Sequence, residues 1–224
     1  MSEIAAISTS SGRTQKIKTW QMFVILCLLS TLISFLFQKL ILTENLFYSL
    51  YSSQMEDYRI DQIFNFINRI QAWGYFLAPL IIYLRLMFMS LAIQLPLLIQ
   101  YVDIPFRTIF RIVTVAFFAV IASDLARFIY LYSLPMNKIN RETLSFIPLS
   151  LSSFLNASSY SQAAYSFLSK INIFEFLWAL IVMKGLNSTG KLHKIDSALI
   201  VLGVWSAIAL FSFGLVLFVD EIFS

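Results

Sequence analysis

The sequence has little of what soluble enzymes use for their chemistry. Its 224 residues include one histidine, His193, and one cysteine, Cys27. A single cysteine cannot form an internal disulfide bond, and a single histidine can build neither a histidine metal cluster nor a Ser-His catalytic pair. Glycine-rich phosphate loops and zinc-protease motifs are also missing. We therefore expect no metal, no cofactor and no enzymatic activity, with a Ser-Lys or carboxylate-dependent enzyme as the catalytic alternative left open.

Charge is scarce as well, and this determines the class of protein. Only 12% of the residues are charged, whereas 59% are hydrophobic and 16% aromatic, and the mean hydropathy is +0.79. Soluble domains carry about twice that share of charge. The net charge of +4 comes without a basic cluster interleaved with aromatic residues, which argues against nucleic acid as a partner. The composition predicts an integral membrane protein.

Five apolar stretches account for most of the chain. A helix needs roughly 20 apolar residues to cross a hydrocarbon core of about 30 Å. Unbroken apolar runs favour helices over the alternating strands of a membrane β-barrel. We predict an all-α bundle of five transmembrane helices in residues 20–224, with spans at about 20–42, 73–99, 109–134, 171–186 and 197–219.

The fourth span is the weakest of the five. It is short, and it contains Glu175 and Lys184. A charge near a helix centre costs about 2.5 to 3.5 kcal/mol on insertion, against about 0.3 to 0.6 kcal/mol gained for each large aliphatic residue or phenylalanine. We expect this span to insert only together with its neighbours.

The distribution of lysine and arginine predicts the orientation. Residues 1–19 are rich in serine and threonine and are expected to form a disordered cytoplasmic tail. Cationic segments tend to stay in the cytoplasm, so we predict a cytoplasmic N-terminus and an outer C-terminus. The cations of this tail and of the loops after the second and fourth spans are Arg13, Lys16, Lys18, Arg107, Arg111, Lys184, Lys191 and Lys194.

The first outer loop contains an amphipathic pattern. Large apolar residues recur there at helical spacing, with polar residues on the opposite face. We predict an interfacial helix on the outer membrane surface that runs into the second span; packing against other loops as a cap is the alternative. The apolar positions are Ile60, Ile63, Phe64, Ile67 and Ile70.

Four charged residues fall inside predicted spans, where charge is expensive and is normally paired. At 1.5 Å per residue, Arg85 lies about 18 Å and Asp124 about 15 Å from the outer ends of their spans. Arg127 lies at about 10 Å and Glu175 at about 6 Å. We therefore predict two level pairs, Arg85 with Asp124 and Arg127 with Glu175. The network is either an interhelical clasp, which we favour, or a proton or anion pathway or lipid-headgroup socket.

The fourth and fifth spans contain a helix-packing motif. Phe174 and Trp178 lie four residues apart and form one bulky ridge. Trp205 in the last span is expected to pack against this ridge. Gly185 lies near the end of the fourth span, where a glycine C-cap is useful.

The segment Ile171 to Leu186, followed by a basic loop and a last helix beginning Ser197-Ala198, resembles the bacterial branch of the Yip1 family. The specific likeness covers about 50 residues, Ser169 to Leu217, and rests on an Asn-x-Phe-x-x-x-Trp type segment that leads through a leucine-rich stretch to Gly-Leu. Five spans, a polar N-terminal tail and a serine-rich stretch before the fourth span also fit that family. Eukaryotic members are implicated in vesicle trafficking with small GTPases, and bacterial members are thought of as accessories of membrane complexes.

The resemblance implies a multi-pass protein of the bacterial inner membrane. We expect a non-enzymatic accessory or scaffold subunit of a membrane complex, with the lipid bilayer and another membrane protein or a second copy as its partners. The alternative is a small transporter or permease subunit that uses the buried Arg and carboxylate network.

Overall fold

The structure, a computed structural model, is all-helical. It describes residues 18–52, 55–135, 138–140, 143–144, 146–155 and 162–223. Residues 1–17 of the predicted tail lie outside the described residues. The predicted all-α class is confirmed. The helices are α1 (Thr19–Leu40), α2 (Glu44–Tyr51), α3 (Asp57–Ile99), α4 (Phe106–Ser133), the 3-10 helix η2 (Leu151–Phe154), α6 (Gln162–Lys170), α7 (Ile173–Asn187) and α8 (Lys194–Phe223).

Four of the helices in the described part of the chain, α1, α3, α4 and α8, are long and apolar enough to cross a membrane. They contain the first, second, third and fifth predicted spans almost entirely. The fourth predicted span forms α7, which has 15 residues and is therefore about 22 Å long. This is shorter than the hydrocarbon core of about 30 Å.

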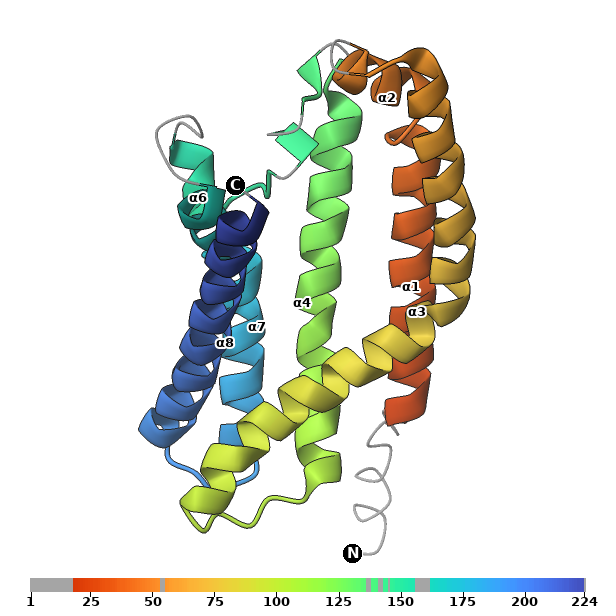
Figure 1. Cartoon of the computed structure of the whole chain (residues 1–224). Coiled ribbons are helices and arrows are strands. Elements are labelled where there is room, and N and C mark those ends of the chain that lie inside the picture. Colours follow the sequence, from red (N-terminus) through yellow and green to blue (C-terminus); the bar gives the residue numbers. More distant parts are fainter. Residues whose placement is uncertain are drawn as a thin grey trace, which may run out of the picture.

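The long helices run alternately up and down the bundle (Figure 1). We call the end at which α1 and α4 begin the lower end, and the opposite end the upper end. The chain rises in α1, descends in α3, rises in α4, descends in α7 and rises again in α8. The start of α1 and the end of α8 therefore lie at opposite ends of the molecule.

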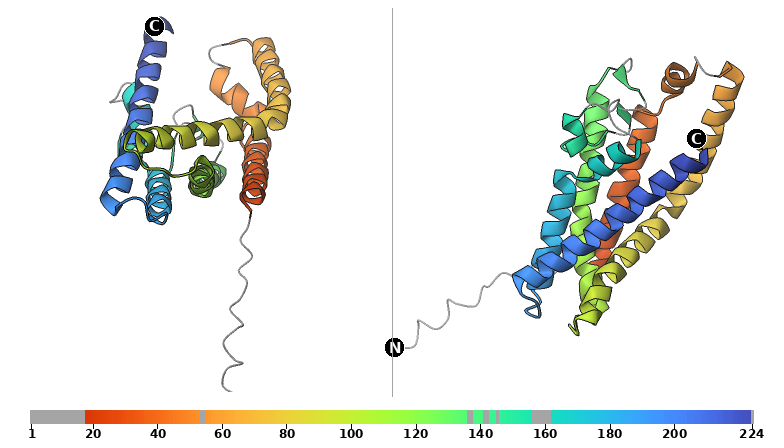
Figure 2. Two further views of the ribbon diagram at one scale, coloured as in Figure 1. Left: turned by 90° about the horizontal axis from the view of Figure 1, so that it is seen from below. Right: turned by 60° about the vertical axis from the view of Figure 1, so that its left-hand side comes forward.

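Helix α3 is the longest and is bent. Its 43 residues would extend about 65 Å if straight, and it includes Pro79 near its middle and Pro96 near its end. Proline inside a helix removes a backbone hydrogen bond and commonly produces a kink. After the bend, α3 passes across α1 and α4 towards α8 (Figure 2). The amphipathic stretch 60–70 is the first part of α3, which continues without a break through the second predicted span.

Helix α4 is the centre of the bundle and packs against α1, α3 and α7. Ile109 and Val113 of α4 are completely buried, as are Leu26 of α1, Leu86 of α3 and Val182 of α7. Burying a large apolar side chain fully contributes about 1.5–3 kcal/mol in water. Between helices within lipid, these buried side chains stabilise the bundle through close van der Waals packing instead.

The segment before α7 folds back over the upper part of the bundle. The backbone N–H of Leu151 donates to Ile171 O (2.9 Å), and that of Ile173 donates to Leu149 O (3.3 Å). Helix α6 packs against α8, with the rings of Phe167 and Phe213 5.5 Å apart. These contacts determine where α7 begins.

Candidate functional site

Five charged side chains from α3, α4, α6 and α7 interact in a series that alternates in sign. Glu175 lies within electrostatic reach of Arg85 and Lys170. Asp124 lies within reach of Arg85 and Arg127. We call the series Lys170, Glu175, Arg85, Asp124 and Arg127 the charge belt. Arg85 therefore lies within electrostatic reach of Asp124, the partner that depth in the spans predicted, and Arg85, not Arg127, is the arginine within reach of Glu175.

Glu175 is positioned by the first turn of α7. The Asn172 side chain caps this helix and accepts hydrogen bonds from the backbone N–H groups of Phe174 (3.0 Å) and Glu175 (2.9 Å). The Trp205 indole of α8 hydrogen-bonds the Glu175 carboxylate. At the end of α6, burial lowers the pKa of Lys170, and the negative charge of Glu175 opposes this shift. Glu175 therefore connects α6, α7 and α8.

Arg85 connects α3 to α4 through an aromatic contact. Its guanidinium lies 4.9 Å from the centre of the Phe117 ring. A cation over an aromatic face is stabilised by about 0.5–2 kcal/mol, with the larger values in desolvated sites. Arg85 thus has an aromatic neighbour in addition to its two carboxylates.

Arg127 connects α4 to the upper loop and to α1. Its guanidinium donates a hydrogen bond to Leu144 O and lies 5.5 Å from the centre of the Phe37 ring. Its Nε atom is buried and has no hydrogen-bond partner in the described part of the chain. The side chain therefore ties three segments together at the upper half of the bundle.

A small polar pocket lies between α1, α3 and α4 beside the belt. Its volume is about 230 Å³, and it is lined by Ile33, Ser34, Phe37, Gln71, Asp124 and Arg127. A water molecule takes about 30 Å³ in the liquid, so the pocket has room for several waters, with polar partners to bind them. The arrangement can hold water and a proton at the Asp124 carboxylate. Within the described residues, no group of three or more metal-binding side chains occurs.

The residues of the helix-packing motif, Phe174, Trp178, Gly185 and Trp205, do not all have the same role. Trp178 is buried in the core, and Phe174 beside it is half-buried. Trp205 bonds Glu175, so the motif and the charge belt are joined. The C-cap interpretation of Gly185 is wrong, because α7 continues past it to a C-cap at Ser188.

Gly185 instead lets α7 approach α4 closely. A Cβ atom built at Gly185 would lie 2.4 Å from Cγ2 of Ile112 on α4, which is far inside van der Waals contact. Small residues serve this purpose at helix interfaces in membranes.

Sequence reasoning missed several partners of the belt. Lys170 lies just before the predicted fourth span of 171–186, so a comparison of charges within the spans could not pair it with Glu175. Phe117 and Phe37 count towards the hydropathy of their spans as apolar residues, but in the structure each ring lies beneath a guanidinium. An arginine within a span that is also rich in phenylalanine is a signal that would have suggested such contacts.

The chain matches no protein-family model, no curated protein and no solved structure. The resemblance to the Yip1 family accordingly stays a prediction from the sequence.

Proposed function

We propose that this protein is a non-enzymatic, Yip1-like accessory or scaffold subunit of a membrane complex, with the belt as the clasp that assembles its helices. The observation that carries the proposal is that the belt charges interact with neighbouring helices. Arg85 lies against α4, Glu175 is bonded from α8, and Arg127 is bonded to the loop after α4. Charges arranged in this way fix which helices are neighbours.

The proposed topology has five spans with a cytoplasmic lower end in a bacterial inner membrane. The alternating course of the helices supports it, since α7 returns the chain to the lower end before α8 rises (Figure 1). Exposed cations at the lower end, Arg107, Arg111 and Lys194 among them, fit the cytoplasmic side. Helix α2 and the first part of α3 then lie at the outer interface.

The proposed partner is another membrane protein or a second copy of this chain. Arg85 and Asp124 keep exposed side chains although they lie within long apolar helices. Hydrocarbon solvates such groups poorly, at a cost of about 2.5–3.5 kcal/mol for each charge at a helix centre. A protein neighbour that covers them removes this cost and accounts for an accessory role.

The charge-neutralising variants Asp124→Asn and Glu175→Gln test the clasp, with Asp103→Asn as the control. Asp103 is an exposed carboxylate in the loop between α3 and α4, outside the belt. We expect both belt variants to lower the yield of folded, monodisperse protein, while the control does not. Mild-detergent purification should recover a membrane partner or a dimer with the wild type. The proposal fails if both belt variants fold at full yield and still bind the same partner.

The pocket at Asp124 specifically favours a second candidate, a small transporter subunit. Asp124 and Arg127 line a cavity large enough for water. Transport predicts that the wild type, reconstituted alone into liposomes, carries protons or anions across the membrane, and that Asp124→Asn abolishes this flux at normal abundance. The accessory role predicts no flux from the protein alone.

A further inference from the structure

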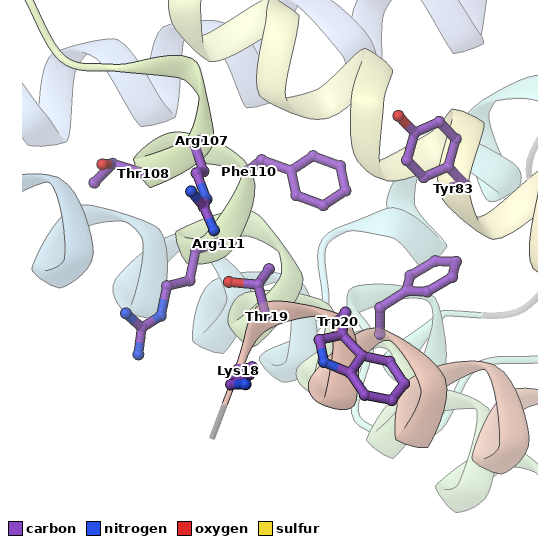
Figure 3. A pocket seen from close by; sticks show the side chains of 9 residues that line it. Lys18, Thr19, Trp20, Tyr83, Arg107, Thr108, Phe110 and Arg111 are labelled. Carbon is purple, nitrogen blue, oxygen red and sulfur yellow. The ribbon is translucent and has the colours of Figure 1, made fainter. Parts of the chain in front are cut away.

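A large pocket opens at the lower end of the bundle, where α1 and α4 begin (Figure 3). It takes no part in the charge belt. Its volume is about 790 Å³, and its walls come from the start of α1, the start of α4 and the middle of α3. The lining residues are Lys18, Thr19, Trp20, Phe23, Tyr83, Arg107, Thr108, Phe110 and Arg111.

The charged side chains that line this pocket in the described part of the chain are positive. They belong to Lys18, Arg107 and Arg111, and no carboxylate occurs among the lining residues that the structure describes. Arg107 and Arg111 lie four residues apart, on adjacent turns of one face of α4, where like charges repel by a few tenths of a kcal/mol. Guanidinium groups bind phosphate through bidentate hydrogen bonds, and a bound anion would relieve the repulsion between the two arginines.

The interior of the pocket is aromatic. Phe23 and Tyr83 meet edge to face with ring centres 6.2 Å apart, and Tyr83 lies 5.9 Å from Phe110. These contacts join α1, α3 and α4 and form an apolar wall beside the cations. Trp20 is 62% exposed at the rim. A ligand that fits such a site carries an anionic group and an apolar portion together.

The pocket lies at the depth in the bundle where the headgroup of a membrane lipid is expected. Arg111 is five residues beyond the first residue of α4, which places it about 8 Å along the helix. Tryptophan and tyrosine at such a level are typical of the membrane interface, where phospholipid headgroups lie. The long side chains of lysine and arginine reach this level from either side.

We infer that this pocket binds the phosphate headgroup of an anionic phospholipid, with Arg107, Arg111 and Lys18 around the phosphate and the start of an acyl chain against Phe23 and Trp20. The inference does not depend on whether the protein is an accessory subunit or a transporter. The shared chemistry is a phosphate group, and free inorganic phosphate is the other source of it.

Quenching of Trp20 fluorescence by brominated lipids tests this site in vesicles. The full chain is reconstituted into phosphatidylcholine vesicles, and brominated phosphatidylglycerol or brominated phosphatidylcholine is added at equal mole fraction. We expect stronger quenching by the anionic lipid, and we expect Trp20→Phe to remove that preference. Equal quenching by the two lipids overturns the inference.

A double arginine variant tests whether the lipid preference comes from the pocket or from the overall positive charge of the lower end. Arg107→Gln with Arg111→Gln should weaken the lipid preference about fivefold for each arginine removed. The control pair, Lys184→Gln with Lys194→Gln, removes the same charge from exposed positions outside the pocket. Equal losses in the two pairs overturn the inference. If the double arginine variant does not fold, the single Arg111→Gln variant is measured in its place.

Inorganic phosphate distinguishes the two ligand sources. Millimolar phosphate should leave the quenching by brominated phosphatidylglycerol unchanged and should not raise the unfolding temperature of the protein in neutral detergent. If phosphate alone stabilises the wild type but not the double arginine variant, the lipid assignment is overturned in favour of a free anion.

Discussion

Replacing Gly185 by alanine should weaken the contact between α7 and α4. The added Cβ would lie 2.4 Å from Cγ2 and 3.0 Å from Cγ1 of Ile112, so the Ile112 side chain or the helix must move. Overpacking of this kind costs about 1–3 kcal/mol. Alanine also gains about 1 kcal/mol over glycine in helix propensity, which would mask part of the cost.

Gly203→Ala provides the matched control because a Cβ atom at Gly203 of α8 would have no neighbour within 4 Å. Both variants share the gain in helix propensity, and their difference in unfolding free energy isolates the steric cost. We expect Gly185→Ala to be less stable than Gly203→Ala by about 1–3 kcal/mol, measured by tryptophan fluorescence during thermal or denaturant unfolding in one detergent.

A double variant tests whether Ile112 is the cause. In an Ile112→Ala background, the two closest atoms, Cγ2 and Cγ1, are gone and only Cβ of residue 112 stays, 3.2 Å from the added Cβ. Most of the difference between Gly185→Ala and Gly203→Ala should therefore disappear. Equal stability of Gly185→Ala and Gly203→Ala with Ile112 present would refute the close-approach role of Gly185.

Two further predictions concern the ends of helices at the upper part of the bundle. Asn172→Ala removes the side-chain cap of α7 and should destabilise the protein by about 0.5–2 kcal/mol. Thr43→Ala is the control and should not destabilise it, because the Thr43 side chain makes no capping hydrogen bond to α2. The free energy of unfolding in detergent measures both effects. The hydrogen bond from Tyr48 Oη to the Asp61 carboxylate (2.6 Å) is the main cause that raises the pKa of Tyr48 to about 12. Because the folded pKa lies above the unfolded value of about 10, the bond stabilises the fold below pH 10 and this contribution is lost as the pH rises through about 12. Ultraviolet titration of tyrosinate should show a tyrosine that ionises near pH 12 in the wild type and is lost in Tyr48→Phe; an unchanged titration curve would contradict the assignment.

The positions of the long helices were largely predictable from the sequence, because hydropathy over about 20 residues is the dominant signal in lipid. The helix predicted at 60–70 was expected to run into the second span, and α3 is continuous from Asp57 to Ile99. The short fourth span was recognised as unusual, and α7 is indeed the helix that falls below the bilayer length.

In the charge belt, the depth of a residue in its span predicted some of its neighbours but not others. Counting residues from the span ends placed Arg85 level with Asp124, and these two residues interact. The same count paired Arg127 with Glu175, but depth gives no information on rotation about the helix axis or on which helices are adjacent. Arg127 contacts Leu144 and Phe37 instead. The bond between Trp205 and Glu175 depends on the crossing of α7 and α8, which sequence spacing does not specify.

The junction between α2 and α3 offers a practical handle on a molecule of only 25.7 kDa. The rings of Phe47 and Phe64 lie 5.3 Å apart there, and Tyr48 is bonded to Asp61, so two separate helices form one surface. An antibody fragment selected to clamp both helices would recognise a conformational epitope that exists only after they have docked. Such a reagent would report native folding during purification and would add the mass and asymmetry that particle alignment in electron cryomicroscopy requires.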